Sequence, residues 1–261
     1  MAATPAGCSR KSPSPTHSGA TQSSPRICSA MADPTASAAT WATWTKSPRP
    51  RSVSLKSVRD NEPYRGLPRY LFGESMGCAV TLLMYFQDPD GWDGLIFSAP
   101  LFIMPEPMKP SWWRLTAYGL LFGLADTWAV MPDNKMVKKA IKDPEKLKMI
   151  ASNPMRYTGK PRVGTMRELC RVCAFFQESF EKVSAPFLTC HGTSDEVTAP
   201  ESSTALYERA KSSDKTLKLY DDMYHSLIQG EPDDNAQIVL KDMREWLDAR
   251  AEKLLASRAA S

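Results

Sequence analysis

The feature that most constrains this chain is a G-x-S-x-G pentapeptide at 73–77, because it joins two segments of different character. The pentapeptide consists of Gly73, Glu74, Ser75, Met76 and Gly77. Residues 69–75 are apolar and aromatic and predict a short strand, whereas 76–86 predict a helix that ends at the turn residues DPDG. A serine between a strand and a helix lies on a strained turn, where we expect only small neighbours to avoid clashes. This context predicts an exposed hydroxyl on Ser75.

Further strands and helices alternate along the rest of the chain. The predicted strands are 94–98, 185–190 and 216–220, and the predicted helices are 201–212 and 233–255. Apolar residues recur at helical spacing in the last helix, at Leu240, Met243, Trp246 and Leu247, which predicts that it faces the core. Strands that alternate with helices imply the α/β class, with a parallel sheet covered by helices on both faces.

Two segments interrupt this pattern. Residues 1–55 are rich in Ser, Thr, Ala and Pro and have no apolar periodicity, so we expect them to be disordered. Residues 100–184 separate the second and third strands and are much longer than an ordinary loop, which predicts a lid or cap. Residues 168–180 within this insertion predict a helix. The core would then comprise 56–99 and 185–261.

The order of three chemically suitable residues predicts a catalytic triad. The chain has only three histidines, and His225 follows the last predicted strand, where a loop can present it over the edge of the sheet. Asp195 follows the third strand, so the order Ser75, Asp195, His225 is that of α/β-hydrolase triads. We expect Ser75 to be the nucleophile, His225 its base and Asp195 the group that fixes the His225 tautomer. The backbone N–H of Met76 would stabilise the developing oxyanion.

Other reactive side chains have simpler interpretations. His191 directly follows the third predicted strand, and we interpret it as a structural loop histidine. Asp221 and Asp222 are alternative partners for His225, but they are so close to it in the chain that we interpret them as solvated turn residues. Cys170 and Cys173 form a lone C-x-x-C in an apolar helical run, which favours buried thiols over a metal or redox site.

Three separated blocks resemble a known family. The sequences GESMG, HGTSDEVTAP and YHSLIQGEP are similar to those of monoacylglycerol lipase-like hydrolases, in particular the plant branch that includes caffeoylshikimate esterase. The resemblance extends from about residue 56 to the C-terminus. It implies an α/β-hydrolase fold, a membrane-facing helical cap at 100–184, and ester substrates such as monoacylglycerols, lysophospholipids or acyl shikimates. It implies neither a metal ion nor an organic cofactor.

The cap carries large apolar side chains that could contact such substrates. These residues are Trp112, Trp113, Leu120, Leu121, Phe122 and Trp128. They could line an acyl tunnel or contact a bilayer surface, and an ordinary cap core explains them equally well.

The resemblance also implies features that the sequence lacks. Members of the family carry an upstream H-G-x-G loop that supplies a second oxyanion donor, and no H-G-x-G occurs in these 261 residues. We expect the strands that flank 69–75 on its other side to be missing as well, and the activity to be impaired. A one-base shift in a back-translation of 27–46 gives a string similar to the family's segment after its fourth strand. We therefore interpret 1–55 as an out-of-frame translation that joins the true frame near residue 56.

The composition narrows the functional classes. A net charge of +4 is too small and too scattered to indicate nucleic-acid binding, and the six cysteines show no spacing of a secreted disulfide framework. No run approaches the roughly 20 apolar residues of a membrane span, and no signal peptide is recognisable. We expect a cytoplasmic or peripherally membrane-associated serine ester hydrolase. The alternatives are an inert hydrolase fragment that serves as an interaction module, and a serine aminopeptidase-like peptidase.

Overall fold

The computed structural model describes residues 64, 66–106, 136–155 and 162–260. The predicted disorder of 1–55 and the large apolar residues predicted at 112–128 of the cap lie outside the described residues. None of the described helices is both long enough and apolar enough to cross a membrane.

Four parallel strands form the sheet. They are β1 (Tyr70–Glu74), β2 (Gly94–Ser98), β3 (Phe187–Gly192) and β4 (Lys215–Tyr220), in the order β1-β2-β3-β4. The two central strands, β2 and β3, are buried at every position, as expected of strands that are covered on both faces, whereas β1 and β4 have exposed positions. Among the described strands β1 and β4 lie at the two edges. Because all the pairings are parallel, the carboxyl ends of the four strands lie at the same end of the sheet. The predicted α/β class with a parallel sheet is confirmed.

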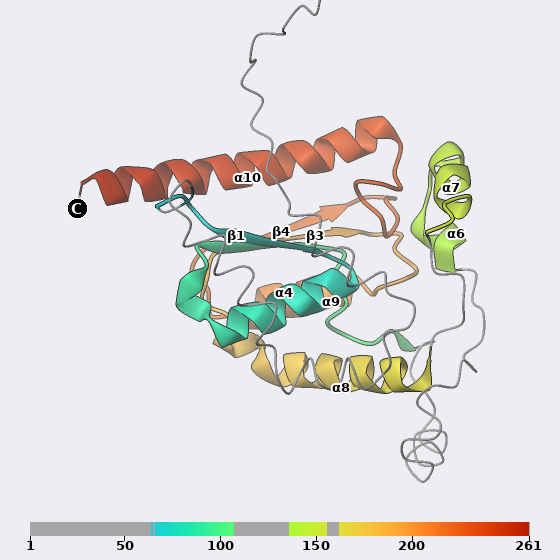
Figure 1. Ribbon diagram of the computed structural model, residues 1–261, viewed down its shortest axis with the longest axis horizontal. Coiled ribbons are helices and arrows are strands. Elements are labelled where there is room, and N and C mark those ends of the chain that lie inside the picture. The colour runs from blue at the N-terminus through green and yellow to red at the C-terminus, as the bar shows by residue number, and fades with distance from the viewer. Residues whose placement is uncertain (1–63, 65, 107–135, 156–161, 261) are drawn as a thin grey trace, which may run out of the picture. The chain divides into compact units, whose positions relative to one another are not determined.

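Helices cover both faces of the sheet, as Figure 1 shows. The helices α4 (Met76–Gln87), α8 (Val163–Ser179) and α9 (Glu201–Arg209) lie on one face, and α10 (Asp233–Ala259) lies on the other. Successive β2 side chains alternate between the two layers. Leu95 and Phe97 pack with residues of α4, α8 and α9, whereas Ile96 packs with residues of α10.

Most of the described part of the insertion is helical. It contains α6 (Met136–Ala140), α7 (Pro144–Ala151), α8 and the short 3₁₀ helix η4 (Phe180–Lys182). A second 3₁₀ turn, η2 (Pro89–Gly91), follows α4. Helix α7 begins where Asp143 accepts the N–H groups of Glu145 (2.8 Å) and Lys146 (3.0 Å), which is an ordinary N-cap. Helix α8 includes most of the helix predicted at 168–180.

Several boundaries differ from the sequence prediction, and three elements show the physical reason or bear on the site. Strand β3 begins and ends two residues later than expected, because the ladder to β4 continues through the pairs His191–Leu219 and Gly192–Tyr220. The prediction that His191 lies in a loop is therefore wrong. Helix α9 ends three residues earlier than predicted, since Ala210 is extended (φ −65°, ψ 139°). Helix α10 continues to Ala259, and its buried Trp246 confirms the predicted core-facing side.

Candidate active site

Ser75 lies on the sharp turn between β1 and α4. Its φ of 55° places a residue with a side chain in the left-handed region, which costs free energy and must be maintained by the surroundings. Three backbone hydrogen bonds do this. The Ser75 N–H donates to Ser98 O (2.9 Å), and the Ser75 carbonyl accepts from Cys78 N (3.1 Å) and Leu101 N (3.2 Å). The neighbouring strand and the loop after β2 therefore fix the backbone of the turn.

Of the two glycines around Ser75, only Gly73 lies so close to other atoms that a larger residue would clash. A Cβ at Gly73 would lie 2.7 Å from backbone atoms of Gly77 and Cys78, so no other residue fits there. A Cβ at Gly77 would meet no described atom within 4 Å. The prediction that both neighbours must be small is therefore wrong for Gly77.

Asp195 and His225 are in direct contact although 30 residues separate them. Asp195 lies in the turn after β3 and His225 in the loop after β4, and Asp195 Oδ2 is 2.8 Å from His225 Nδ1. The other carboxylate oxygen, Oδ1, accepts the N–H groups of Val197 (2.7 Å) and Thr198 (3.0 Å). Asp195 is thus fixed from both sides, and its side chain is fully buried.

The environment favours the ionised form of Asp195. Burial by itself would raise the pKa of this carboxyl group. The hydrogen bonds from His191 and His225, together with the backbone N–H of Thr198, outweigh burial and hold the pKa of Asp195 well below its usual range. An anionic Asp195 can orient His225 and stabilise an imidazolium there.

Thr198 joins the contact between Asp195 and His225. Its Oγ1 lies 2.8 Å from Asp195 Oδ2, 3.1 Å from His225 Nδ1 and 3.1 Å from the carbonyl oxygen of Ala99. Ala99 itself has a φ of 47° and donates its N–H to Cys190 O (2.8 Å). Thr198 therefore ties the turn of Asp195 to the end of β2. Sequence reasoning missed this residue, since it is one of several polar residues in the block HGTSDEVTAP.

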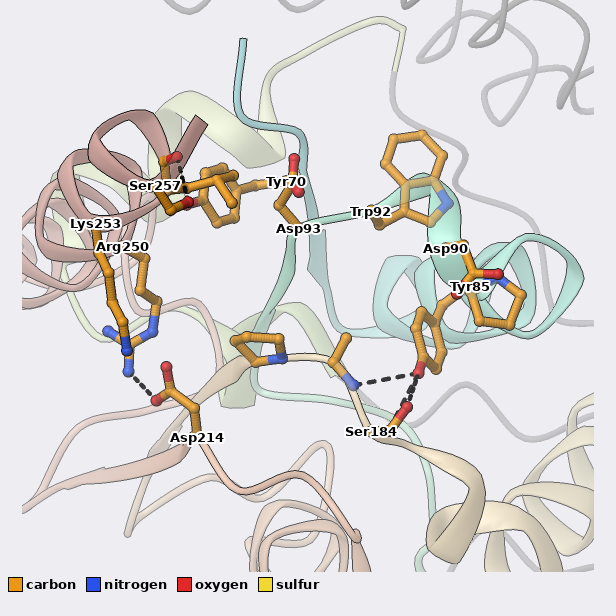
Figure 2. Close-up of a pocket in the computed structure, with 14 residues that line it drawn as sticks. Tyr70, Tyr85, Asp90, Trp92, Asp93, Ser184, Asp214, Arg250, Lys253 and Ser257 are labelled. Carbon is orange, nitrogen blue, oxygen red and sulfur yellow. Dashed lines mark hydrogen bonds and ion pairs between the residues drawn. The ribbon is translucent and has the colours of Figure 1, made fainter. Parts of the chain in front are cut away.

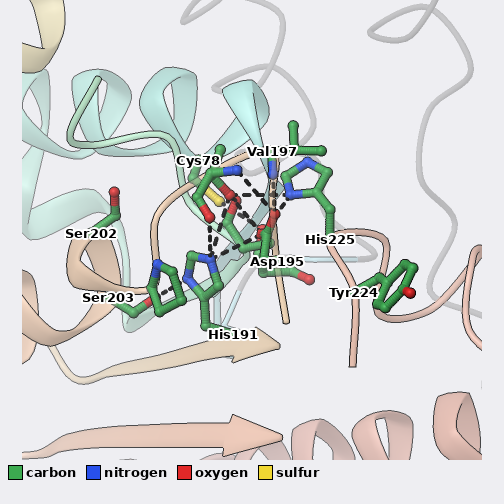
Figure 3. Close-up of polar contacts among 12 residues, drawn as sticks. Cys78, His191, Asp195, Val197, Ser202, Ser203, Tyr224 and His225 are labelled. Carbon is green, nitrogen blue, oxygen red and sulfur yellow. Dashed lines mark hydrogen bonds and ion pairs between the residues drawn. The ribbon is translucent and has the colours of Figure 1, made fainter. Parts of the chain in front are cut away.

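His191 is bound to the same carboxylate as His225. Its ring is fully buried at the carboxyl end of β3, and Nε2 lies 3.0 Å from Asp195 Oδ2 (Figure 3). On its other side Nδ1 lies 2.8 Å from Ser203 Oγ of α9. Asp221 and Asp222, in contrast, are exposed on the turn after β4, as predicted. Asp222 pairs with Lys142 at 2.7 Å instead of contacting His225.

A side-chain bridge joins the serine turn to the histidine loop. Ser226 Oγ, one residue after the histidine, donates to Oε1 of Glu74, one residue before the serine, at 3.1 Å. The buried Glu231 fixes the same loop, because its carboxylate accepts the N–H of Tyr224 (2.6 Å) and the amide of Asn235 (2.8 Å). The contact of Glu74 with Ser226 joins residues 152 positions apart, so no local pattern could have predicted it.

The side chain of Met76 contacts a sulfur-rich apolar cluster. Its buried members are Leu101, Met104, Met166 and Cys173, with Met76, Leu169 and Cys170 packed against them. The residues come from the serine turn, the loop after β2 and helix α8. They form a polarisable apolar core beside the serine turn. The predicted substrate contacts Trp112, Trp113, Phe122 and Trp128 lie outside the described residues.

A cavity of about 480 Å³ lies at the opposite end of the strands (Figure 2). Its lining includes Tyr70 at the start of β1, Trp92 before β2 and Asp214 before β4. Arg250 of α10 pairs with Asp214 at its wall, and the Tyr85 hydroxyl accepts the Ala185 N–H at 3.2 Å. Because Ser75 follows the carboxyl end of β1, this cavity is separate from the serine and histidine turns.

Comparison with known families agrees with this geometry. The sequence model of the family described as serine aminopeptidase, S33 (Hydrolase_4) matches residues 50–233. The chain belongs to this family. The caffeoylshikimate esterase of Arabidopsis thaliana is 70% identical over 200 residues, which cover 76% of this chain and 60% of that protein. The human monoglyceride lipase is 26% identical over 187 residues, which cover 72% and 60% of the two chains.

Solved structures show the same fold. A monoglyceride lipase variant from Saccharomyces cerevisiae, crystallised with a substrate analogue, superposes with a TM-score of 0.65 at 23% identity and covers 77% of this chain and 68% of that one. The predicted resemblance to monoacylglycerol lipase-like α/β-hydrolases is confirmed. The chain spans about 60% of the length of the curated relatives named above.

Proposed function

We propose that this chain is a serine ester hydrolase in which Ser75 is the nucleophile, His225 the general base and Asp195 its orienting partner. The observation that carries the proposal is the 2.8 Å contact between Asp195 and His225, in a chain that also holds Ser75 on a turn with positive φ. The bridge from Glu74 to Ser226 supports it, because it ties the residues adjacent to Ser75 and His225 to each other.

The proposed reaction is acyl transfer to Ser75 followed by hydrolysis. Ser75 Oγ forms a bond to the ester carbonyl carbon, and His225 Nε2 takes the serine proton. The resulting imidazolium donates from Nδ1 to the ionised Asp195 and returns the proton from Nε2 to the departing alcohol. Water then attacks the acyl-serine with His225 again as the base, and the acid is released.

One oxyanion donor can be assigned. The Met76 N–H is the first of α4 and has no partner within the helix, so it can donate to the carbonyl oxygen as that oxygen becomes negative. The upstream motif that would supply a second donor does not occur in the sequence. In serine hydrolases each such donor is worth a factor of roughly 10²–10³ in kcat.

The proposed substrates are esters with an apolar or aromatic acyl group. The relatives named above are a caffeoylshikimate esterase and monoglyceride lipases, which suggests monoacylglycerols, lysophospholipids and acyl shikimates. The apolar cluster around Met76 suits such groups, because methionine side chains adapt to different shapes. We further infer that the insertion at 100–184 acts as the cap and contacts membrane surfaces through its Trp and Leu residues.

Two other functions compete with this proposal. The name of the matching family favours a peptidase that removes N-terminal residues. The second alternative is an inert hydrolase fragment that serves as an interaction module.

Hydrolysis assays separate the three functions. The full chain is compared with Ser75→Ala on a monoacylglycerol, a p-nitrophenyl acyl ester and an aminoacyl anilide. The proposal requires ester hydrolysis that disappears in Ser75→Ala. Cleavage of the anilide in preference to both esters supports the peptidase instead. A chain that is folded by circular dichroism and cleaves none of them is the inert fragment.

A further inference from the structure

His191 has no role in the proposed reaction, although it is among the most buried polar side chains described. Its ring is 0% exposed, and both of its nitrogens have partners. Nε2 lies 3.0 Å from Asp195 Oδ2 and 3.2 Å from the carbonyl oxygen of Thr198. Nδ1 lies 2.8 Å from Ser203 Oγ. Because an unpaired buried nitrogen is costly, these partners hold the His191 ring in one orientation.

These partners determine which nitrogen carries the proton. A carboxylate and a carbonyl oxygen can only accept, so Nε2 of His191 must be a donor. In the neutral ring Nδ1 is then an acceptor, and it receives the hydroxyl proton of Ser203. Ser203 Oγ in turn accepts from Thr189 Oγ1 at 2.8 Å. The hydrogen bonds therefore run in one direction: Thr189 donates to Ser203, Ser203 to His191, and His191 to Asp195. Every donor and acceptor in this series has a partner when the His191 ring is neutral.

Oδ2 of Asp195 thus accepts hydrogen bonds from two imidazole rings. His225 Nδ1 approaches it at 2.8 Å and His191 Nε2 at 3.0 Å, as Figure 3 shows. Each additional donor reduces the negative charge that the oxygen can offer to the other donors. The position of Asp195 and the strength of its bond to His225 should both depend on His191.

We infer that His191 is a positioning residue, whose neutral ring fixes the Asp195 carboxylate and shares its Oδ2 with His225. The inference rests on the proposed roles of Asp195 and His225. It goes beyond the triad because it adds a buried second histidine, linked through Ser203 to helix α9, as a determinant of how His225 is oriented.

Nitrogen NMR of the full chain tests the arrangement directly. The sequence contains only His17, His191 and His225, so His17→Gln and His225→Gln assign the three rings. In the wild-type chain at neutral pH, ¹⁵N-histidine labelling should show His191 as a neutral ring protonated at Nε2. A charged His191, or one protonated at Nδ1, overturns the inference without any variant of that residue.

Two substitutions test the shared oxygen. His191→Leu removes the competing donor, so the Nδ1–H proton of His225 should move downfield as its bond to Asp195 strengthens. His191→Gln places an amide N–H near the former position of Nε2 and should return this proton most of the way to its wild-type position. If His191→Leu is folded and the His225 proton does not move, the inference is wrong.

Catalysis gives a second readout. With a p-nitrophenyl ester, kcat should fall roughly tenfold in His191→Leu and less than about threefold in His191→Gln, with KM little changed in both. Equal losses in the two variants would contradict the inference. A wild-type chain that shows the expected resonances but hydrolyses no ester refutes the proposed function and not the positioning role. An active enzyme without those resonances refutes only the positioning role.

Discussion

Replacement of Asp195 by asparagine tests the electrostatics of the site most sharply. The amide oxygen can still accept the N–H groups of Val197 and Thr198 that Oδ1 accepts now. The amide nitrogen, however, takes the place of Oδ2, where His225 Nδ1 and His191 Nε2 both converge within 3.0 Å. The amide N–H groups would then face the N–H groups of both histidines. His225 would therefore adopt the tautomer that is protonated at Nε2 and not at Nδ1.

The expected magnitude follows from that tautomer. A His225 with its proton on Nε2 cannot take the proton of Ser75, and this loss costs roughly 10⁴ in kcat, or about 5.4 kcal/mol. Asp222→Asn is the matched control, because Asp222 is also an aspartate close to His225 in the chain but is exposed and paired with Lys142. We expect it to lower kcat less than about threefold. Equal losses in the two variants, or more than a tenth of wild-type kcat in Asp195→Asn, would refute the reasoning.

The same variant predicts a pH-dependent stability. The pKa of Asp195 in the folded chain lies well below its ordinary value of 3.8, so the ionised carboxylate stabilises the fold above pH 3.8. This contribution is lost as the pH falls from about 5 towards the folded pKa. Asp195→Asn should therefore have a lower Tm than the wild type at pH 7, and the difference should shrink by pH 3. If circular dichroism shows the same Tm difference between the two chains from pH 7 to pH 3, ionisation of Asp195 does not stabilise the fold.

Three further predictions concern the surroundings of the site. A Cβ at Gly192 would lie 2.2 Å from Met223 O in the histidine loop, so Gly192→Ala should destabilise the fold by about 1–3 kcal/mol and reduce hydrolysis; Gly77→Ala, which meets no described atom within 4 Å, is the thermal-melt control. Burial raises the pKa of the Cys173 and Cys190 thiols to about 12, so at pH 8 only about one in ten thousand is ionised; iodoacetamide should leave both unmodified until the chain is denatured, and rapid alkylation of the native protein would contradict this. Ser75→Gly should raise the Tm relative to Ser75→Ala, because glycine adopts the φ of 55° without strain; an equal Tm would show that the turn stores no strain.

The sequence predicted the parts of the fold that depend on local patterns. Strand β2 has the predicted bounds, and β1 and α4 differ by one or two residues, because apolar runs bounded by turn residues are visible without tertiary information. Strand β3 was displaced by two residues, since its end depends on pairing with β4 and not on its own residues. That error placed His191 in a loop and concealed its burial.

The candidate site was predictable only in outline. Ser75, Asp195 and His225 follow from the order of strands, turns and suitable residue types. The contacts of Glu74 with Ser226 and of Thr198 with His225 join distant segments through side chains. Such contacts arise when the strands align, so the sequence of any one segment does not contain them. The histidine of β3 was likewise visible in the sequence, but its bond to Asp195 was not.

The central claim is that Ser75 is an activated nucleophile, and fluorophosphonate labelling tests it most directly. The purified full chain is treated with the probe, digested, and searched by mass spectrometry for the modified peptide, with Ser75→Ala as the control. We expect a single modified serine, Ser75, and no modification of the control chain. A folded wild-type chain that remains unlabelled, or one labelled equally with and without Ser75, would contradict it.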